Sequence, residues 1–125
     1  DPDRSAHRIR DAISGRKGTD VGVVVSDTFG RPWRRGVTDV AIGCAGLRPV
    51  IDLRGTTDSF GRELQVTEVA VVDEIAAAAE RVMGKSTGIP VAVVRGLPES
   101  VFTAPGEHAS VIGDLVRHHH EDLFR

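Results

Sequence analysis

The sequence has 125 residues and a mass of 13.4 kDa, the size of one domain. The formal net charge is −2 at pH 7 and the pI is about 6.2, which excludes the strong positive field of a general nucleic-acid-binding protein. The 40% apolar content excludes disorder of the whole chain, and no apolar run approaches the roughly 18 residues of a membrane span.

A single cysteine, Cys44, excludes an internal disulfide framework and a zinc site with several cysteines. It fits a reducing, cytoplasmic setting. The first residue is Asp1, and no basic region followed by an apolar stretch opens the chain. We therefore expect no signal peptide, and we expect either that a start was removed or that the chain is part of something longer.

The first predicted element is a short amphipathic helix that follows Pro2 and keeps apolar residues at helical spacing. The side-chain oxygen of Asp3 or Ser5 is the expected N-cap. Gly15 is the expected end of this helix, and Gly18 is expected in the loop beyond it.

A buried strand is predicted over residues 21–25, a short and mostly β-branched run. The chain then enters a predicted loop, residues 26–36, which combines polar, aromatic and basic side chains. Open α/β sheets place their ligands in loops that follow such strands. This loop is therefore the first candidate site.

Residues 37–68 are expected to hold short strands and turns. Residues 40–46 contain too many glycines for a stable helix and suit close packing or bends. Residues 49–53 and 64–68 look like further short strands, separated by a turn-rich loop at residues 55–61.

The clearest helix is predicted over residues 69–83, which are rich in helix formers and end at Gly84. A second buried strand is predicted over residues 91–94, directly after Pro90. Residues 111–116 are compatible with helix or strand.

Asp27 and Thr28 are the sharpest candidate residues in the loop. A carboxylate and a hydroxyl are hard oxygen ligands suited to Mg²⁺ or Mn²⁺. Arg31, Arg34 and Arg35 could hold phosphate or carboxylate oxygens. The alternative is that Asp27 caps a turn and the arginines are solvated.

The Gly84-Lys85-Ser86 triplet resembles the end of a phosphate-binding P-loop, but the resemblance fails. The required glycine five residues earlier is Ala79. The triplet also follows a predicted helix, whereas a P-loop precedes one.

Other candidate residues have ordinary structural interpretations. Trp33 could stack on a planar ligand or pack at a domain or subunit contact. Cys44 is expected to be a small buried thiol, and the three histidines at residues 118–120 a solvated surface run. Surface charge is the default interpretation for the carboxylates of Asp52, Asp58, Glu63 and Glu68.

Taken together, these residues resemble the coenzyme F-420-0:L-glutamate ligases, or γ-glutamyl ligases. The most specific string is Ser-Asp-Thr-Phe-Gly-Arg-Pro-Trp-Arg at residues 26–34. The match continues in order through residues 39–46, 58–64, 67–80, 82–85, 88–96 and 121–125. The resemblance implies an α+β fold, with a mixed β-sheet and flanking helices, and identifies residues 1–125 with the C-terminal half of the ligase domain.

The resemblance also implies the reaction. GTP phosphorylates the terminal carboxylate of F-420-0, and the α-amino group of L-glutamate attacks the resulting acyl phosphate to form an amide. Mn²⁺ or Mg²⁺ offsets the negative charge of the phosphates. A homodimer is expected, and neither a nucleic acid nor a membrane is an expected partner.

By the same resemblance, Asp27 matches a metal ligand and Thr28 a ligand of a second metal ion. Lys85 replaces a residue that can be Gln near the metal in relatives, and its ammonium is expected to contact phosphate instead. Arg31 and Arg34 are expected on physical grounds to contact anions. The segment that matches a nucleotide-contacting stretch comprises Met83, Gly84, Lys85, Ser86, Thr87, Gly88 and Ile89.

The upstream half of the domain is expected to supply a nucleotide-binding opening segment, a Ser and Lys pair, and another metal-binding Asp. None of these precedes Asp1 in this sequence. The isolated chain is therefore expected to have weak or no ligase activity. Two alternatives stay open: a non-catalytic remnant or structural fragment of that domain, and a metal-dependent phosphate-binding module.

Overall fold

The computed structural model describes residues 1–124, apart from the side chain of Ile112, so Arg125 of the matched terminal segment lies outside the described residues. No helix in this part of the chain is long and apolar enough to cross a membrane. In chain order, the elements are α1 (Pro2–Lys17), β1 (Val23–Gly30), β2 (Val37–Ala45), β3 (Ile51–Asp52), β4 (Glu68–Val69), α2 (Val71–Met83), η1 (Glu99–Val101), α3 (Val111–Asp114) and η2 (His119–Glu121).

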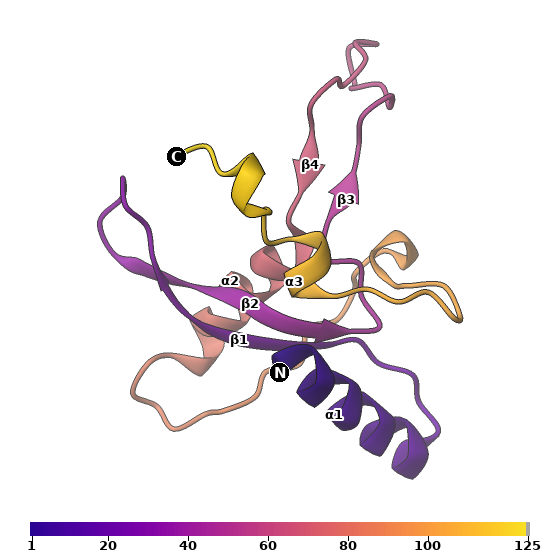
Figure 1. Ribbon diagram of the computed structural model, residues 1–125. Coiled ribbons are helices and arrows are strands. Elements are labelled where there is room, and N and C mark those ends of the chain that lie inside the picture. The colour runs from indigo at the N-terminus through magenta and orange to yellow at the C-terminus, as the bar shows by residue number, and fades with distance from the viewer. Residues whose placement is uncertain (125) are drawn as a thin grey trace.

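The centre of the molecule is the antiparallel ribbon of β1 and β2 (Figure 1). Its register runs from the Val23–Ala45 pair to the Gly30–Val37 pair, with one irregularity next to Ser26. The predicted loop at residues 26–36 was therefore placed too early, because β1 continues to Gly30. A long β2 offers hydrogen-bond partners beyond the apolar run, and this cross-strand pairing outweighs the local turn signals.

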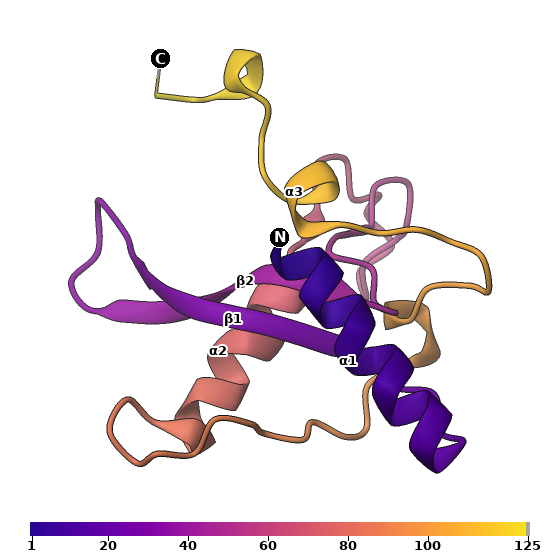
Figure 2. The same cartoon turned by 60° about the horizontal axis from the view of Figure 1, so that its bottom comes forward.

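The two main helices cover opposite faces of the ribbon. In Figure 2, α1 crosses in front of the ribbon and α2 passes behind it. On the α1 side, a Cβ atom added at Gly43 would lie 2.4 Å from the carbonyl carbon of Pro2, so only glycine permits this approach. On the α2 side, the backbone N–H of Ala41 donates to Oδ1 of Asp73 at 2.9 Å.

The core lies where β2, α2, η1 and α3 meet, and it is built from small and medium side chains. Val72 and Cys44 are the largest fully buried side chains among the described residues. The buried cluster comprises Ala41, Cys44, Leu47, Val71, Val72, Val101 and Val111.

The first helix differs from its prediction at both ends. The side chain of Asp1, and not that of Asp3 or Ser5, accepts the capping hydrogen bond. Gly15 lies inside the helix, which ends at Gly18 in the left-handed conformation (φ 61°). A single glycine is tolerated because tertiary packing outweighs its low helix propensity.

Asp3 instead links three elements. Its Oδ1 accepts a hydrogen bond from the backbone N–H of Cys44 in β2 at 2.8 Å. The same oxygen accepts from the backbone N–H of Val111 at the start of α3, at 3.1 Å.

The α+β class is confirmed, but the described strands form two antiparallel pairs and not one mixed sheet. The predicted strands at 49–53 and 64–68 shorten to β3 and β4, which form the base of a projecting hairpin arm (Figure 1). Residues 91–94, predicted as a buried strand, have no strand partner in the described part of the chain. Residues 111–116 begin with the helix α3.

Candidate functional site

Residues from the two candidate segments meet in a three-residue group, the Thr28 cluster, formed by Thr28, Asp39 and Lys85. Thr28 and Asp39 are paired across the β1–β2 ribbon. The Thr28 hydroxyl donates to Oδ1 of Asp39 at 3.4 Å and accepts from Nζ of Lys85 at 2.7 Å. Lys85 Nζ also donates to Oδ1 of Asp39, with which it forms an ion pair.

Burial explains why this cluster needs its lysine. Asp39 is only 7% exposed, and a buried carboxylate is costly unless a cation or hydrogen-bond donors compensate it. The side chain of Lys85 remains 43% exposed, so its ammonium lies at the boundary between the ribbon and solvent. An ammonium held there can also meet an anion arriving from solvent.

Asp27 lies beside the cluster in sequence but on the other face of the ribbon, because successive strand residues point to opposite faces. It is exposed, and its Oδ1 accepts from the backbone N–H of Thr28 at 2.7 Å. The structure therefore does not bring the Asp27 and Thr28 side chains to one point. The assignment of the two residues to separate metal ions, which the family resemblance implies, stays a prediction.

The oxygen atoms of Asp27 and Thr28 suit Mn²⁺ or Mg²⁺ in type. Across residues 1–124, however, no group of three or more His, Cys, Asp or Glu side chains could hold a metal ion. The described residues fit a divalent cation as partial contributors, and further ligands would have to come from elsewhere.

The predicted nucleotide-contacting segment forms a loop directly after α2. Gly84 and Gly88 adopt positive φ angles of 64° and 72°, which let the chain turn twice. The Thr87 hydroxyl donates to the carbonyl of Met83, and the backbone N–H of Ile89 donates to Thr87 Oγ1 at 3.4 Å. The triplet beginning at Gly84 follows a helix, so its rejection as a P-loop is confirmed.

Arg31 and Arg34 lie in the turn beyond β1. The Arg34 backbone N–H donates to the Arg31 carbonyl at 3.3 Å, and the Arg31 guanidinium donates to the carbonyl of Arg35 at 3.5 Å. Within residues 1–124, neither side chain forms a hydrogen bond or ion pair with the Thr28 cluster. Trp33 is 81% exposed in the same turn, and its ring lies 6.5 Å from that of Phe124.

Two ordinary interpretations are confirmed. Cys44 is fully buried, and burial, reinforced by the negative charges of Asp3 and Asp114, raises the pKa of its thiol to about 11. The three histidines at residues 118–120 are exposed, and the His118 and His120 rings stack at 5.6 Å.

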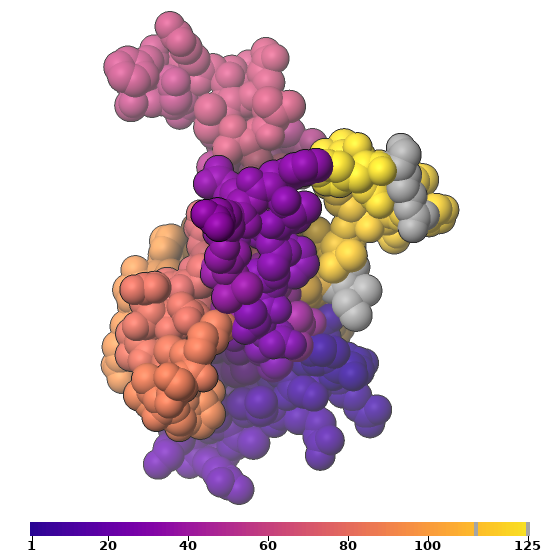
Figure 3. Space-filling model, turned by 90° about the vertical axis from the view of Figure 1, so that its left-hand side faces the viewer, coloured from indigo at the N-terminus to yellow at the C-terminus, as the bar shows by residue number. Residues whose placement is uncertain are grey.

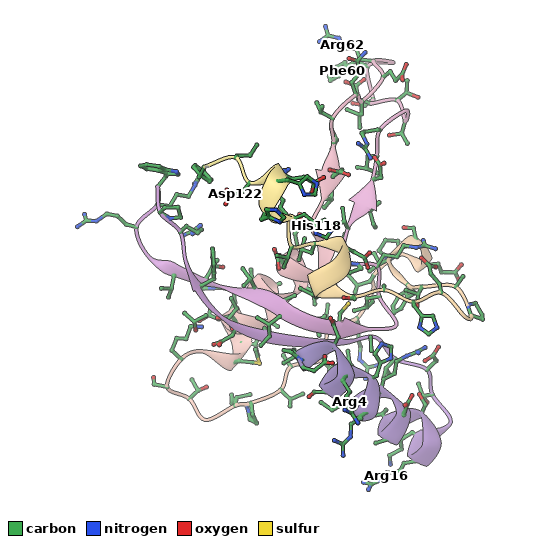
Figure 4. All side chains as sticks on the ribbon, viewed as in Figure 1. Arg4, Arg16, Phe60, Arg62, His118 and Asp122 are labelled. Carbon is green, nitrogen blue, oxygen red and sulfur yellow. The ribbon has the colours of Figure 1, made fainter. Side chains whose placement is uncertain are left out.

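The carboxylates of the hairpin arm serve local structure. Asp52 pairs with Arg54, which lowers the pKa of Asp52 to about 2, and Arg54 also pairs with Glu68 at 3.2 Å. Oδ1 of Asp58 accepts two backbone N–H groups in the turn. Figure 4 labels Phe60 and Arg62 at the far end of this arm, away from the ribbon.

Sequence reasoning assigned no role to Asp39. The available signal was its position: Asp39 and Ala41 alternate along β2, and both are buried. A carboxylate on the same strand face as a buried residue is itself expected to be buried and to need a cation or hydrogen-bond donor. This need marks Asp39 as a candidate site residue.

Comparison with known proteins identifies the family to which this chain is similar. A sequence model of the family described as F420-0:Gamma-glutamyl ligase matches residues 1–96. A coenzyme F420:L-glutamate ligase of Methanocaldococcus jannaschii is 44% identical over 125 residues, covering 99% of this chain and 48% of the relative. A protein of the same name from Methanococcus maripaludis (strain C7) is 43% identical with the same coverage.

The chain thus spans about half the length of these curated relatives. The family match covers α1, the β1–β2 ribbon, the hairpin arm, α2 and the loop that carries Lys85. This chain belongs to the F420-0:Gamma-glutamyl ligase family.

Proposed function

We propose that this chain is the C-terminal half, residues 1–125, of a ligase that joins L-glutamate to coenzyme F-420-0 and uses GTP and a divalent metal ion. Family membership supports ligation of glutamate. The observation that carries the proposal is the bond between Lys85, from the expected nucleotide segment, and Thr28, an expected metal ligand. Thr28 and Lys85 are 57 residues apart in the sequence, and the family resemblance assigns both to the same reaction. They contact each other in the fold.

In the proposed reaction, the terminal carboxylate of F-420-0 attacks the γ-phosphorus of GTP and GDP leaves. The α-amino nitrogen of L-glutamate then attacks the carbonyl carbon of the acyl phosphate. An amide forms, inorganic phosphate leaves and the amine loses a proton. Such phosphoryl transfer depends mainly on positioning and on stabilising negative charge.

Lys85 is the residue of this chain best placed to stabilise that charge. Its ammonium is partly exposed and can donate to a phosphate oxygen while Asp39 and Thr28 hold it in position. Asp27 would contribute an oxygen ligand to Mn²⁺ or Mg²⁺, which supplies charge neutralisation when bound, and Thr28 would contribute one once the Lys85 ammonium has moved from its hydroxyl to a phosphate. Arg31 and Arg34 would contact anionic groups of the substrates after rearrangement of their turn.

The chain spans about half of its relatives, so we propose that activity requires the other half of the domain. The working unit would be a homodimer in the cytoplasm. The pure 125-residue chain would then turn over weakly or not at all, and appreciable ligation by that chain alone would contradict this part of the proposal.

The test is glutamate ligation by this chain co-expressed with the complementary half of the Methanocaldococcus jannaschii relative. Lys85→Met is expected to lower the ligation rate by about 100-fold or more, because it removes a charge that stabilises the transition state. Lys85→Arg should retain part of the rate. The matched control is Lys17→Met at the exposed end of α1, which should leave the rate unchanged.

Metal binding gives a second readout. Asp27→Asn keeps the side-chain shape but removes its charge, so it should weaken Mn²⁺ binding by the assembly at least about tenfold. Asp11→Asn, on the exposed surface of α1, is the control. Unchanged Mn²⁺ affinity in Asp27→Asn would exclude Asp27 as a ligand, and a well-formed assembly without ligation would favour a structural role for the chain.

A further inference from the structure

Residues 89–94, here called the valine segment, expose apolar side chains that a folded domain normally covers. The exposed fractions are 71% for Val91 and 76% for Val93, and still 46% for Ile89 and 41% for Val94. In Figure 3 the chain that follows α2, coloured salmon to orange, lies at the molecular surface beside the β1–β2 ribbon. By contrast, the similar valine run at the start of β1 is half-buried.

Exposure alternates over residues 91–93 of the valine segment, while Ile89, Pro90 and Val94 are also exposed. Ala92 is half-buried, whereas its neighbours Val91 and Val93 are largely exposed. Alternation with a period of two is the pattern of an extended strand with one face on the protein and the other open. Pro90 at the start and Gly96 after the end are the residues that usually bound a strand.

Most of the backbone of this segment is also unused: Ile89 donates its N–H to Thr87 Oγ1, Pro90 has no N–H, and the groups that follow have no backbone partner in the described part of the chain. Within residues 1–124, no backbone–backbone hydrogen bond links residues 89–96 to another segment, and none of them belongs to a helix or strand. An extended, β-branched run with free N–H and C=O groups is a template for pairing with another strand. Most natural proteins cover such an edge, because it otherwise promotes aggregation.

The length of the relatives indicates what covers it. The family match extends to residue 96, so the valine segment belongs to the part shared with the family. The chain covers 48% of the M. jannaschii relative, and no described element of this half pairs with the segment. The covering element is therefore expected in the half of the ligase that this chain does not span.

We propose that the valine segment is a sheet strand that pairs, backbone to backbone, with a strand of the complementary half of the ligase domain. That half also packs apolar side chains on Val91 and Val93. The proposal rests on the proposed function only for the identity of the partner. It explains why a sequence typical of a buried strand lies here without a neighbour.

The test is amide hydrogen exchange of the full 125-residue chain, alone and co-expressed with the complementary half of the M. jannaschii relative. Alone, peptides covering the valine segment should exchange at nearly unprotected rates. In the complex, their exchange should slow by about 100-fold or more. The hairpin tip near Phe60 should exchange equally in both samples and is the internal control.

A backbone variant makes the test specific. Val93→Pro removes one backbone donor and should weaken the complex by about tenfold or more. Val66→Pro is the matched control, because Val66 is also a highly exposed valine outside helices and strands (89% exposed), and it should leave affinity unchanged. If Val93→Pro abolishes folding, Val93→Lys against Val66→Lys gives the same comparison for apolar packing.

Three outcomes would overturn the inference: no complex, a complex in which the valine segment stays unprotected, or protection that appears in the chain alone as its concentration rises. The last outcome would identify a second copy as the partner. Ligation is measured on the same samples. Protection without ligation would refute the proposed function and leave the strand pairing standing, whereas ligation without protection would refute the pairing.

Discussion

Asp39 owes its position to a balance between burial and charge. Its carboxylate is 7% exposed, and the compensating groups come from β1 and from the loop after α2. A buried charge held by one hydroxyl and one ammonium fixes both donors in space. The same contact therefore positions Lys85 and ties the loop to the ribbon.

Asp39→Asn should lower the free energy of unfolding by roughly 1–3 kcal/mol, because it removes a charge-assisted hydrogen bond at a buried site. The control is Asp52→Asn, which breaks an ion pair between half-exposed, solvent-screened side chains and should therefore cost clearly less. Urea denaturation of the two variants measures the difference. Equal losses would mean that Asp39 contributes no more than a surface ion pair.

Cys44 predicts a pH dependence of stability. Its pKa is about 11 in the folded chain against an ordinary value of 9.0, so the folded state holds the thiol proton more tightly than the unfolded state. This contribution is fully present below pH 9 and is lost as the pH rises from about 9 to about 11.

The free energy of unfolding is expected to be higher for the unaltered chain than for Cys44→Ala. This difference should decrease by about 1 kcal/mol between pH 8 and pH 10. Urea titrations of both proteins at the two pH values measure this change. A difference that stays constant would show that the thiol ionises equally well in both states.

Single residues also show what the sequence could predict. Burial of Cys44 follows from a lone thiol among small apolar residues, and its prediction is confirmed. The burial of Asp39 had a signal in its alternation with Ala41, but its partners could not be predicted, because the strand register pairs it with Thr28 and a distant loop brings Lys85. These contacts join three separate segments: β1, β2 and the loop after α2.

At the scale of elements, the contact between α1 and β2 depends on one missing side chain. A Cβ atom at Gly43 would meet the backbone of Pro2 at 2.4 Å, and backbone atoms cannot rotate away as a flexible side chain can. The start of α1 therefore lies directly on the ribbon.

Gly43→Ala should destabilise the fold by roughly 1–3 kcal/mol, because α1 must shift to admit the methyl group. Gly30→Ala is the matched strand control, since nothing lies within 4 Å of its added Cβ, and its effect should stay within about 0.5 kcal/mol. Thermal unfolding followed by circular dichroism separates them. A Gly43→Ala protein as stable as the control would show that α1 does not need this close approach.

Elements were predicted where local pattern determines them. Both long helices were expected within a few residues of their observed bounds, because helical periodicity and terminal glycines are local signals. The length of β1 and the absence of a strand at residues 91–94 were not predicted, because a strand forms only where it has a hydrogen-bond partner. The partner of β1 lies 7 residues further along, whereas none for residues 91–94 lies in the described part of this chain.

At the scale of the whole molecule, the hydrophobic cluster is small for 125 residues, and large apolar side chains on several elements remain exposed. Ile9 on α1 and Val82 on α2 are 46% and 68% exposed, in addition to the valine segment. Such exposure is typical of a surface that meets another polypeptide. It agrees with a chain that spans about half of its relatives.

Native mass spectrometry with Mn²⁺ and GTP should therefore distinguish two samples. The chain alone should retain little Mn²⁺ or GTP, because its own ligands are incomplete. The chain co-expressed with the complementary half should retain both, at a mass corresponding to a dimer of the two-part unit. Tight retention of both ligands by the 13.4 kDa chain alone would show that one half suffices for binding.

The two hydrogen bonds accepted by Asp3 have a consequence for how the chain is made. Its partners are the amides of Cys44 and of Val111, the latter 108 residues downstream. At about 5–20 residues per second, a ribosome adds the second partner roughly 5–20 seconds after the first turn of α1. Until then the nascent helix has only part of its anchor, so α1 is expected to dock fully only after Val111 has been added.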